Sequence, residues 1–253
     1  MGYLVSYGER DCDLRLFAAL RDVKDVFYID VGANDPQNMS VTKLFYDRGG
    51  RGINIEPQSR YVGEYAVYRP RDINVRAGVS DEDGELELRG SGVLASFTEN
   101  QYTEKSSRTE TVPIKRLDEI CDESVEPGTD IHFLKIDAED FEEKVLLGMN
   151  LKKYRPWIIM IEAHTHEWEK LITDNDYSYA STDGLNRYYV SAEHSGLAER
   201  LKDYKKILSD CAIIYALPGS EAENAHKAVE QMKNSTSWRI TKPLRWLGKK
   251  LHK

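Results

Sequence analysis

The sequence predicts an α/β fold built on a mostly parallel sheet. Short apolar, β-branched segments alternate along the chain with segments whose apolar residues have helical spacing. Glycine, proline or an acid ends most of the apolar segments, as expected for strands that stop at a turn. The expected strands are 26–31, 51–57, 72–81, 84–89, 131–137 and 156–164. The expected helices are 6–23, 40–49 and 139–149.

The first elements are a helix, a strand and a second helix. In the segment 6–23, Leu14 and Phe17 have the spacing of one helix face. The β-branched and aromatic run "VFYIDV" follows and ends at Gly32, as a buried strand would. "SVTKLFYDRG" can then form a helix that Ser40 caps.

The later elements continue this alternation. "RGINIEP" is a second strand that Pro57 ends, and "DINVRAGVSD" is a third. The strict alternation in "GELELR" is typical of a strand with one solvent-facing side. "IHFLKID" and "PWIIMIEAH" are two further strands, and the helix-like "EDFEEKVLLGM" lies between them. Strands that alternate with helices favour the parallel sheet.

Composition indicates one large globular domain with an appendage. The chain has 253 residues, of which 40% are hydrophobic and 31% are charged. The central apolar run "WIIMI" is too short to span a bilayer, and we see no secretory signal at the N-terminus. Cys12, Cys121 and Cys211 are isolated in the sequence, which favours reduced thiols over disulfides or a zinc site. We therefore expect a cytoplasmic protein.

The net charge of -8 conceals an uneven distribution. The last twenty residues, 234–253, hold six of the basic residues and no acid, so the rest of the chain has 29 basic and 43 acidic residues. An acidic body repels phosphate backbones. We therefore do not expect nucleic acid as the main partner.

Several of the predicted strands end in an acid. Asp30, Glu56, Asp137 and Glu162 hold these positions. Because ligands of a parallel sheet bind beyond the carboxyl ends of its strands, we expect these acids to border one site.

The first two of these acids indicate a nucleoside-containing cofactor. Glu56 follows Gly32 by 24 residues, the distance at which an acid ending the second strand accepts hydrogen bonds from ribose hydroxyls. NAD and S-adenosylmethionine both contain this ribose. "VGANDP" lacks the glycine-rich turn that a pyrophosphate needs, and Asp30, Asn34 and Asp35 suit the amino-acid end and sulfonium of S-adenosylmethionine better.

Five segments in order resemble a known family. "FYIDVGANDP", "INIEP", "VSDEDGELEL", "FLKIDAEDFEEKVLLGM" and "IEAH" together resemble the FkbM family of S-adenosylmethionine-dependent methyltransferases. "SYGERDCDL" and "DGLNRYYV" are similar to a subgroup common in bacterial surface-polysaccharide loci. The resemblance covers roughly residues 5–190.

This resemblance implies the Rossmann-like class I methyltransferase fold. Its mostly parallel, seven-stranded sheet has helices on both faces and an antiparallel last strand. We expect this domain at 1–217, with a helical lead-in at 1–25, and a helical spacer with a basic amphipathic tail at 218–253.

The resemblance also implies which residues hold the cofactor, S-adenosyl-L-methionine. The first turn contacts its methionine end, which assigns Gly32, Asp30, Ala33 and Asn34 to that role. The acid after the second strand, Glu56, holds the ribose.

Beyond the ribose, the resemblance makes Val79, Ser80 and Asp81 in "GVSDEDG" candidates near the adenine. The chain departs from the family pattern at two positions. Pro36 replaces a second glycine of the first turn, a form that belongs to the subgroup. Asp140, beside Phe141, replaces the helix-start glycine of "KIDVEGAE" and would either reshape specificity or mark a degraded site.

Methyl transfer to a hydroxyl requires a group that removes the hydroxyl's proton. His164 titrates in the right range, and Asp137 or Glu139 could also serve. Alternatively, a divalent metal held by Asp137, Glu162 and His164 could lower the pKa of the hydroxyl. A metal-free mechanism is the favoured one.

The segment "DGLNRYYV" is a candidate wall for the acceptor. Asn186 and Arg187 offer hydrogen-bond donors, and Tyr188 or Tyr189 could stack on a sugar face. The alternative is a turn that leads into the last hairpin.

The C-terminal segment 238–253 interleaves tryptophan and leucine with basic residues. A basic amphipathic helix of this kind is typical of a membrane-surface anchor, here on the inner membrane face. A solvated or oligomerising tail is the alternative.

The leading hypothesis is an S-adenosylmethionine-dependent O-methyltransferase that acts on a sugar hydroxyl of a surface glycan or its precursor. A second hypothesis keeps the reaction but uses a non-sugar acceptor, with N- or O-methylation. A third is a catalytically inactive, membrane-peripheral module with the same fold. The single-glycine turn disfavours a fourth, an NAD-linked oxidoreductase.

Overall fold

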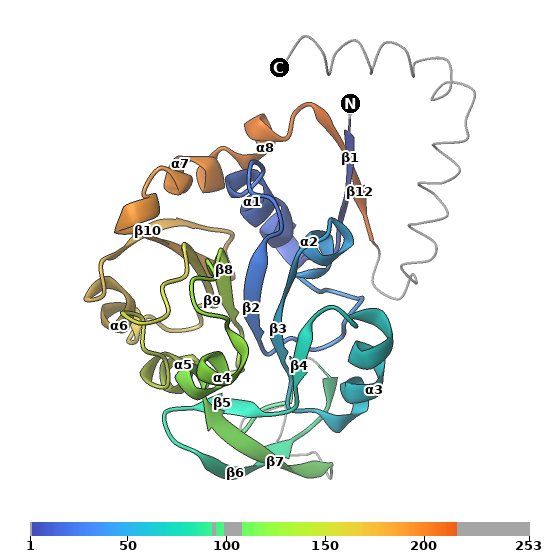
Figure 1. Cartoon of the computed structure of the whole chain (residues 1–253), viewed down its shortest axis with the longest axis vertical. Helices are drawn as coiled ribbons and strands as arrows, with labels where there is room; N and C mark the ends of the chain where they lie inside the picture. The colour runs from blue at the N-terminus through green and yellow to red at the C-terminus, as the bar shows by residue number, and fades with distance from the viewer. Residues whose placement is uncertain (1, 93–94, 99–107, 217–253) are drawn as a thin grey trace.

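The computed structural model describes residues 2–92, 95–98 and 108–216, and its centre is a seven-stranded sheet (Figure 1). The strands lie in the order β10–β11–β9–β8–β2–β3–β4. Their bounds are β2 Phe27–Val31, β3 Arg51–Ile55, β4 Ile73–Val75, β8 Phe133–Ile136, β9 Ile158–Glu162, β10 Tyr177–Thr182 and β11 Asn186–Ser191.

Strands β2, β3, β4, β8 and β9 are parallel, and β11 runs antiparallel to both of its neighbours. From β2 the chain builds outward to β3 and β4, and it later builds outward in the other direction through β8 and β9. The boundary between β2 and β8 is therefore the point where the strand order reverses, which is where open α/β sheets bind ligands. This topology confirms the predicted class I methyltransferase fold.

Helices cover both faces of this sheet, because its buried strands are apolar on both sides. In β2, Ile29 packs in the core under α4, α5 and α6, whereas Tyr28 packs in the core under α1, α2 and α7. The first group of helices is α4 Leu117–Ser124, α5 Glu142–Leu147 and α6 Glu169–Thr173. The second group is α1 Cys12–Ala19, α2 Lys43–Asp47 and α7 Leu197–Lys202.

Shorter elements complete the fold. Helix α3 (Ser59–Tyr68) contacts β4, and α8 (Tyr204–Ile207) contacts α1. Two short 3₁₀ helices lie at Glu9–Asp11 and Ala192–His194.

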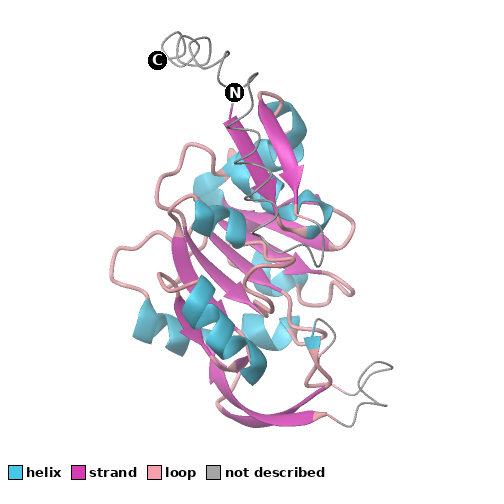
Figure 2. Ribbon diagram, turned by 90° about the vertical axis from the view of Figure 1, so that its right-hand side faces the viewer, coloured by secondary structure: helices cyan, strands magenta, loops and turns pink. Residues whose placement is uncertain are grey.

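Two small sheets lie at opposite ends of the molecule (Figure 2). Strands β5 (Gly78–Ser80), β6 (Gly84–Arg89) and β7 (Thr109–Arg116) form one of them, in the order β5–β7–β6. Strand β1 (Gly2–Ser6) pairs in parallel with β12 (Cys211–Tyr215) in the other. The second sheet brings together two segments from opposite ends of the described chain.

The structure corrects two sequence-based boundaries. The expected lead-in helix at 1–25 begins with strand β1, because that segment pairs with β12, about 200 residues away in the chain. The expected strand 72–81 is divided between β4, which pairs with β3, and β5, which pairs with β7. The predicted tail, 218–253, lies outside the described residues. Within the described part of the chain, no helix is long and apolar enough to cross a membrane.

Candidate active site

A cavity of about 560 Å³ opens beyond the carboxyl ends of β2, β3, β8 and β9. This volume is within the range of small-molecule sites. The acids predicted at the strand ends, Asp30, Glu56, Asp137 and Glu162, all line it. Asn186 lines it too, because antiparallel β11 begins opposite the end of β9 and pairs Asn186 with Glu162.

The turn after β2 requires glycine at position 32. Gly32 has a φ of 71°, and a Cβ added there would lie 1.7 Å from the carbonyl oxygen of Asp137. The backbone N–H groups of Gly32 and Ala33 both donate to the carbonyl oxygen of Ile55, at 3.0 and 3.1 Å. The glycine therefore allows the turn to approach the end of β8, in addition to leaving room for a ligand.

Pro36 fits the loop that follows this turn. The Asp35 carboxylate accepts backbone N–H bonds from Gln37 at 2.8 Å and from Asn38 at 3.0 Å, so the loop is held locally. The carbonyl oxygen of Pro36 accepts a 2.9 Å bond from Nε of the fully buried Arg69. Arg69 was not among the predicted site residues, because its role depends on contacts between distant segments.

Hydrogen bonds from the backbone fix both carboxylate oxygens of Glu56. One oxygen accepts the backbone N–H of Asn34 at 2.7 Å, and the other accepts that of Gln58 at 2.9 Å. Burial raises the pKa of Glu56, and these hydrogen bonds act against that rise. Each oxygen keeps a further lone pair for a ligand hydroxyl.

Lys135 lies at the boundary between β2 and β8. Its ammonium group is 3.2 Å from carboxylate oxygens of both Asp30 and Asp137, and it donates a 2.6 Å bond to the carbonyl oxygen of Gly32. Burial acts to lower the pKa of Lys135, but the two carboxylates outweigh burial and raise it above its ordinary value. Lys135 therefore remains charged and fixes the first turn against the end of β8.

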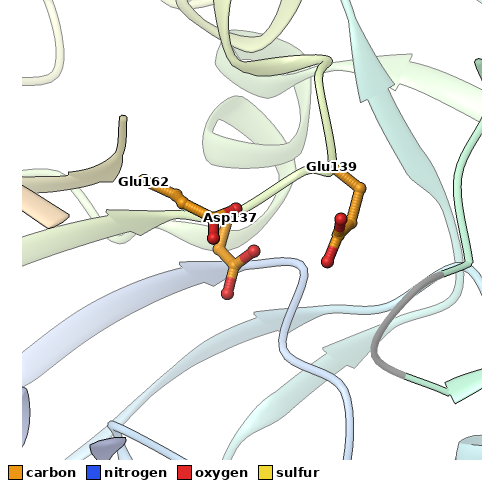
Figure 3. A group of neighbouring side chains, drawn as sticks. All are labelled: Asp137, Glu139 and Glu162. Atoms are coloured by element: carbon orange, nitrogen blue, oxygen red, sulfur yellow. The ribbon is translucent and has the colours of Figure 1, made fainter. Parts of the chain in front are cut away.

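Three carboxyl groups that line the cavity converge in space. Asp137, Glu139 and Glu162 each offer one oxygen, and these oxygens all lie within 4.8 Å of one another (Figure 3). Burial, followed by the charge of Asp137, raises the pKa of Glu162 to about 9. The same two causes, in the same order, raise the pKa of Glu139 to about 7.

His164, predicted as a base and as a metal ligand, is not part of the cavity wall. Its side chain is 54% exposed, and its Nε2 lies 3.4 Å from one oxygen of Glu162. The convergent group therefore contains Glu139 where the sequence-based metal set had His164.

Several other predicted residues also lie away from the cavity wall. The Ser80 hydroxyl bonds to Asp81, and Asp81 pairs with Lys144 at 2.9 Å. Tyr188 is fully buried and donates to Asp183, whereas Arg187 pairs with Glu169. Ala77, Gly78 and Val79 line the cavity in the segment just before Ser80. Of the four acceptor candidates named from the sequence, Asn186 lines the cavity, whereas Arg187, Tyr188 and Tyr189 do not.

Ala95 and Phe97 border the cavity, and their segment packs against the segment after β8. The Ser96 hydroxyl donates a 2.8 Å bond to the carbonyl oxygen of Glu139, and the rings of Phe97 and Phe141 lie 5.6 Å apart. Both phenylalanines line the cavity, whereas exposed Asp140 does not. Sequence reasoning missed Phe97, because no local pattern connects it to Phe141.

Known proteins resemble this chain in sequence and in structure. The sequence matches the family described as the methyltransferase FkbM domain over residues 30–184. A TehB-like SAM-dependent methyltransferase from Corynebacterium glutamicum matches in structure over 71% of this chain and 87% of its own, at 10% identity and a TM-score of 0.40. That similarity is too low to support an argument about function. No curated protein matches the chain.

Proposed function

Because the chain belongs to the FkbM methyltransferase domain family and is therefore a methyltransferase, we propose that it methylates a sugar hydroxyl of a surface glycan or of its precursor. The family implies S-adenosylmethionine as the methyl donor. The observation that carries this proposal is that Glu56, the Gly32 turn and three converging carboxyl groups line one cavity.

The residues present fit S-adenosylmethionine. Glu56 has both carboxylate oxygens oriented by backbone N–H groups, as an acceptor for two ribose hydroxyls requires. Gly32, Ala33 and Asn34 would hold the amino-acid end, and Asp30 beside Lys135 fixes the base of that turn. Ala77, Gly78 and Val79 form a small, mostly apolar wall that suits an adenine ring. When bound, the cofactor supplies a sulfonium-bound methyl group that an oxygen nucleophile can displace.

The three converging carboxyl groups suit a hydroxyl substrate. A sugar hydroxyl is a poor nucleophile at neutral pH, so the protein must orient it and provide a path for its proton. Asp137, Glu139 and Glu162 offer hydrogen-bond acceptors there, and the Asn186 side chain offers a donor. Phe97 and Phe141 add apolar surface to the cavity wall, on which a sugar ring face can pack.

The proposal is tested by transfer of an isotope-labelled methyl group from S-adenosylmethionine. The full chain is incubated with cell-envelope glycan fractions, with simple sugars and, in parallel, with small amines and phenols. We expect label in an ether linkage on a sugar, identified by mass spectrometry after hydrolysis. Label on nitrogen or on a phenol would support the non-sugar alternative, and cofactor binding without turnover on any acceptor would support the inactive module.

A further inference from the structure

The carboxyl groups of Asp137, Glu139 and Glu162 form a cluster that the family assignment does not explain. Asp137 directly follows β8, Glu139 lies in the loop after it, and Glu162 is the last residue of β9. Figure 3 shows the three groups entering the same space, Glu162 and Asp137 from one side and Glu139 from the other. Their nearest oxygens lie within 4.8 Å of one another, a separation that a single metal ion of coordination distance about 2.0–2.6 Å can bridge.

A second observation points to a ligand at this cluster. The Glu162 side chain is only 10% exposed, and its Oε2 is buried without a hydrogen-bond partner among the described residues. A buried carboxylate oxygen without a partner is unfavourable, and such atoms in native proteins commonly contact an ion or a water molecule. The other oxygen, Oε1, lies 3.4 Å from Nε2 of His164, and Figure 3 shows the Glu162 side chain extending toward Asp137.

The charge around the cluster also favours a cation. Lys135 forms ion pairs with Asp30 and Asp137, so the four carboxyl groups Asp30, Asp137, Glu139 and Glu162 lie near one buried ammonium group. Lys135 binds Oδ2 of Asp137 and thereby fixes the orientation of that carboxylate. A bound divalent cation would favour the ionised form of these carboxyl groups and balance the negative charge that they then carry.

We propose that Asp137, Glu139 and Glu162 bind one hard divalent cation, Mg²⁺ or Mn²⁺. Three carboxylate oxygens with open remaining positions are typical of such ions, which keep several water ligands. The three carboxyl groups line the same cavity as Gly32 and Glu56, so the cation would lie beside the expected cofactor position.

The catalytic consequence rests on the proposed methyltransferase function, whereas the binding itself does not. An acceptor hydroxyl that replaces one metal-bound water has a lowered pKa, so its proton passes more readily to water in the open cavity. The hydroxyl oxygen would also be oriented by its bond to the cation.

The test measures binding of Mn²⁺ to the full chain. Binding is detected as the loss of the free-ion signal in electron paramagnetic resonance. We expect a single saturable site for which Mg²⁺ competes. Glu139→Gln and Glu162→Gln should each weaken Mn²⁺ binding by about tenfold or more, because loss of even an outer-shell partner of a metal ligand weakens binding about 10–100-fold. Both substitutions preserve side-chain shape, and Glu139 lies in a loop, so its variant should fold even if Glu162→Gln does not.

The matched control is Asp140→Asn, which removes a neighbouring exposed acid whose side chain is outside the cavity wall. This variant should bind Mn²⁺ as the wild type does. Absence of saturable Mn²⁺ binding, or equal affinity in all variants, would overturn the site. Titration with S-adenosylmethionine in the same samples separates the two proposals: cofactor binding without Mn²⁺ binding refutes the metal site alone, and the reverse result refutes the proposed function alone.

Discussion

At the scale of single residues, Gly32 meets two requirements that no other residue type can meet together. Its φ of 71° is in the left-handed region, and an added Cβ would overlap the Asp137 carbonyl oxygen. The first requirement costs another residue about 1–2 kcal/mol. The second forces the β2 turn away from the end of β8.

We therefore predict that Gly32→Ala lowers the free energy of unfolding by about 2–5 kcal/mol, the sum of the conformational cost and an overpacking cost of about 1–3 kcal/mol. Urea unfolding at pH 7 measures this change in the free energy of unfolding. The control is Gly63→Ala in helix α3, where nothing lies within 4 Å of the new Cβ. That variant should gain about 0.5–1 kcal/mol, and a Gly32→Ala protein of wild-type stability would disprove the packing argument.

Asp140, which differs from the family pattern, has a φ of 74° and an exposed side chain. The backbone there adopts a conformation that glycine adopts freely, which fits the glycine of the family pattern that the sequence resembles. We predict that Asp140→Ala lowers the free energy of unfolding by about 1 kcal/mol, whereas Asp140→Gly does not. Methyl transfer by Asp140→Gly should stay within about twofold of the wild type, and a large loss would show that the carboxylate takes part in the reaction.

At the scale of secondary-structure elements, the start of β2 depends on a buried histidine. Nδ1 of His132 accepts the backbone N–H of Phe27 at 2.9 Å, and the imidazole packs edge-on against Trp157. Burial lowers the pKa of His132 below its ordinary value of 6.5. A protonated Nδ1 could not accept the bond, so the neutral ring is the one that fits.

Because the folded pKa of His132 is lowered, the unfolded chain binds its proton first as the pH falls. The contribution of His132 to stability is therefore complete above about pH 6.5 and is lost progressively below it. We predict that His132→Asn, which keeps an acceptor that does not titrate, lacks this loss. The free energies of unfolding of both proteins are compared from pH 7.5 to 5, and a constant difference between them would contradict the assignment.

The strands that could be predicted from the sequence are those whose signal is local. β2, β3, β8 and β9 are short, largely apolar runs that end in a turn residue or an acid, so these strands and the acids near their carboxyl ends were predicted. The expected strands 51–57 and 156–164 extend two residues beyond the ends of β3 and β9. β7 was missed because its segment "TETVPIKR" contains Pro113 and charged residues, and only Val112 and Ile114 in it are fully buried. The segment forms a strand because it pairs with β5 and β6.

In the candidate site, too, some residues have a local sequence signal and others are placed by contacts between distant segments. Glu56 and Gly32 could be identified from their spacing in the chain. The contacts of Arg69 with Pro36 and of Phe97 with Phe141 depend on packing between segments far apart in sequence. His164 follows a strand end as the acids do, but its exposed side chain lies outside the cavity wall.

At the scale of the whole molecule, the β1–β12 sheet joins the two ends of the described chain at the end of the molecule opposite β5, β6 and β7 (Figure 2). The basic segment 238–253 follows β12 in sequence and lies outside the described residues. Its composition supports the proposal that it binds the anionic inner membrane face. A basic residue near such a surface contributes about 1 kcal/mol to binding.

We predict that reversing Arg245, Lys249 and Lys250 to Glu weakens binding to vesicles that contain anionic lipid by about a hundredfold or more. Sedimentation with vesicles measures this. Charge reversal of exposed Lys205 and Lys206 in α8 is the control and should have little effect. If the two variants bind alike, the tail is not the membrane contact.

The central claim is that Glu56 and the turn after β2 hold S-adenosylmethionine, and isothermal titration of the full chain with this cofactor tests it most directly. We predict saturable binding by the wild type and by Glu64→Gln, an exposed acid on α3. Glu56→Gln should bind about 10–100-fold more weakly, since hydrogen bonds to a charged acceptor contribute about 1.5–3 kcal/mol. Folded wild-type protein that binds no cofactor, or a Glu56→Gln variant that binds as tightly as the wild type, would contradict the account.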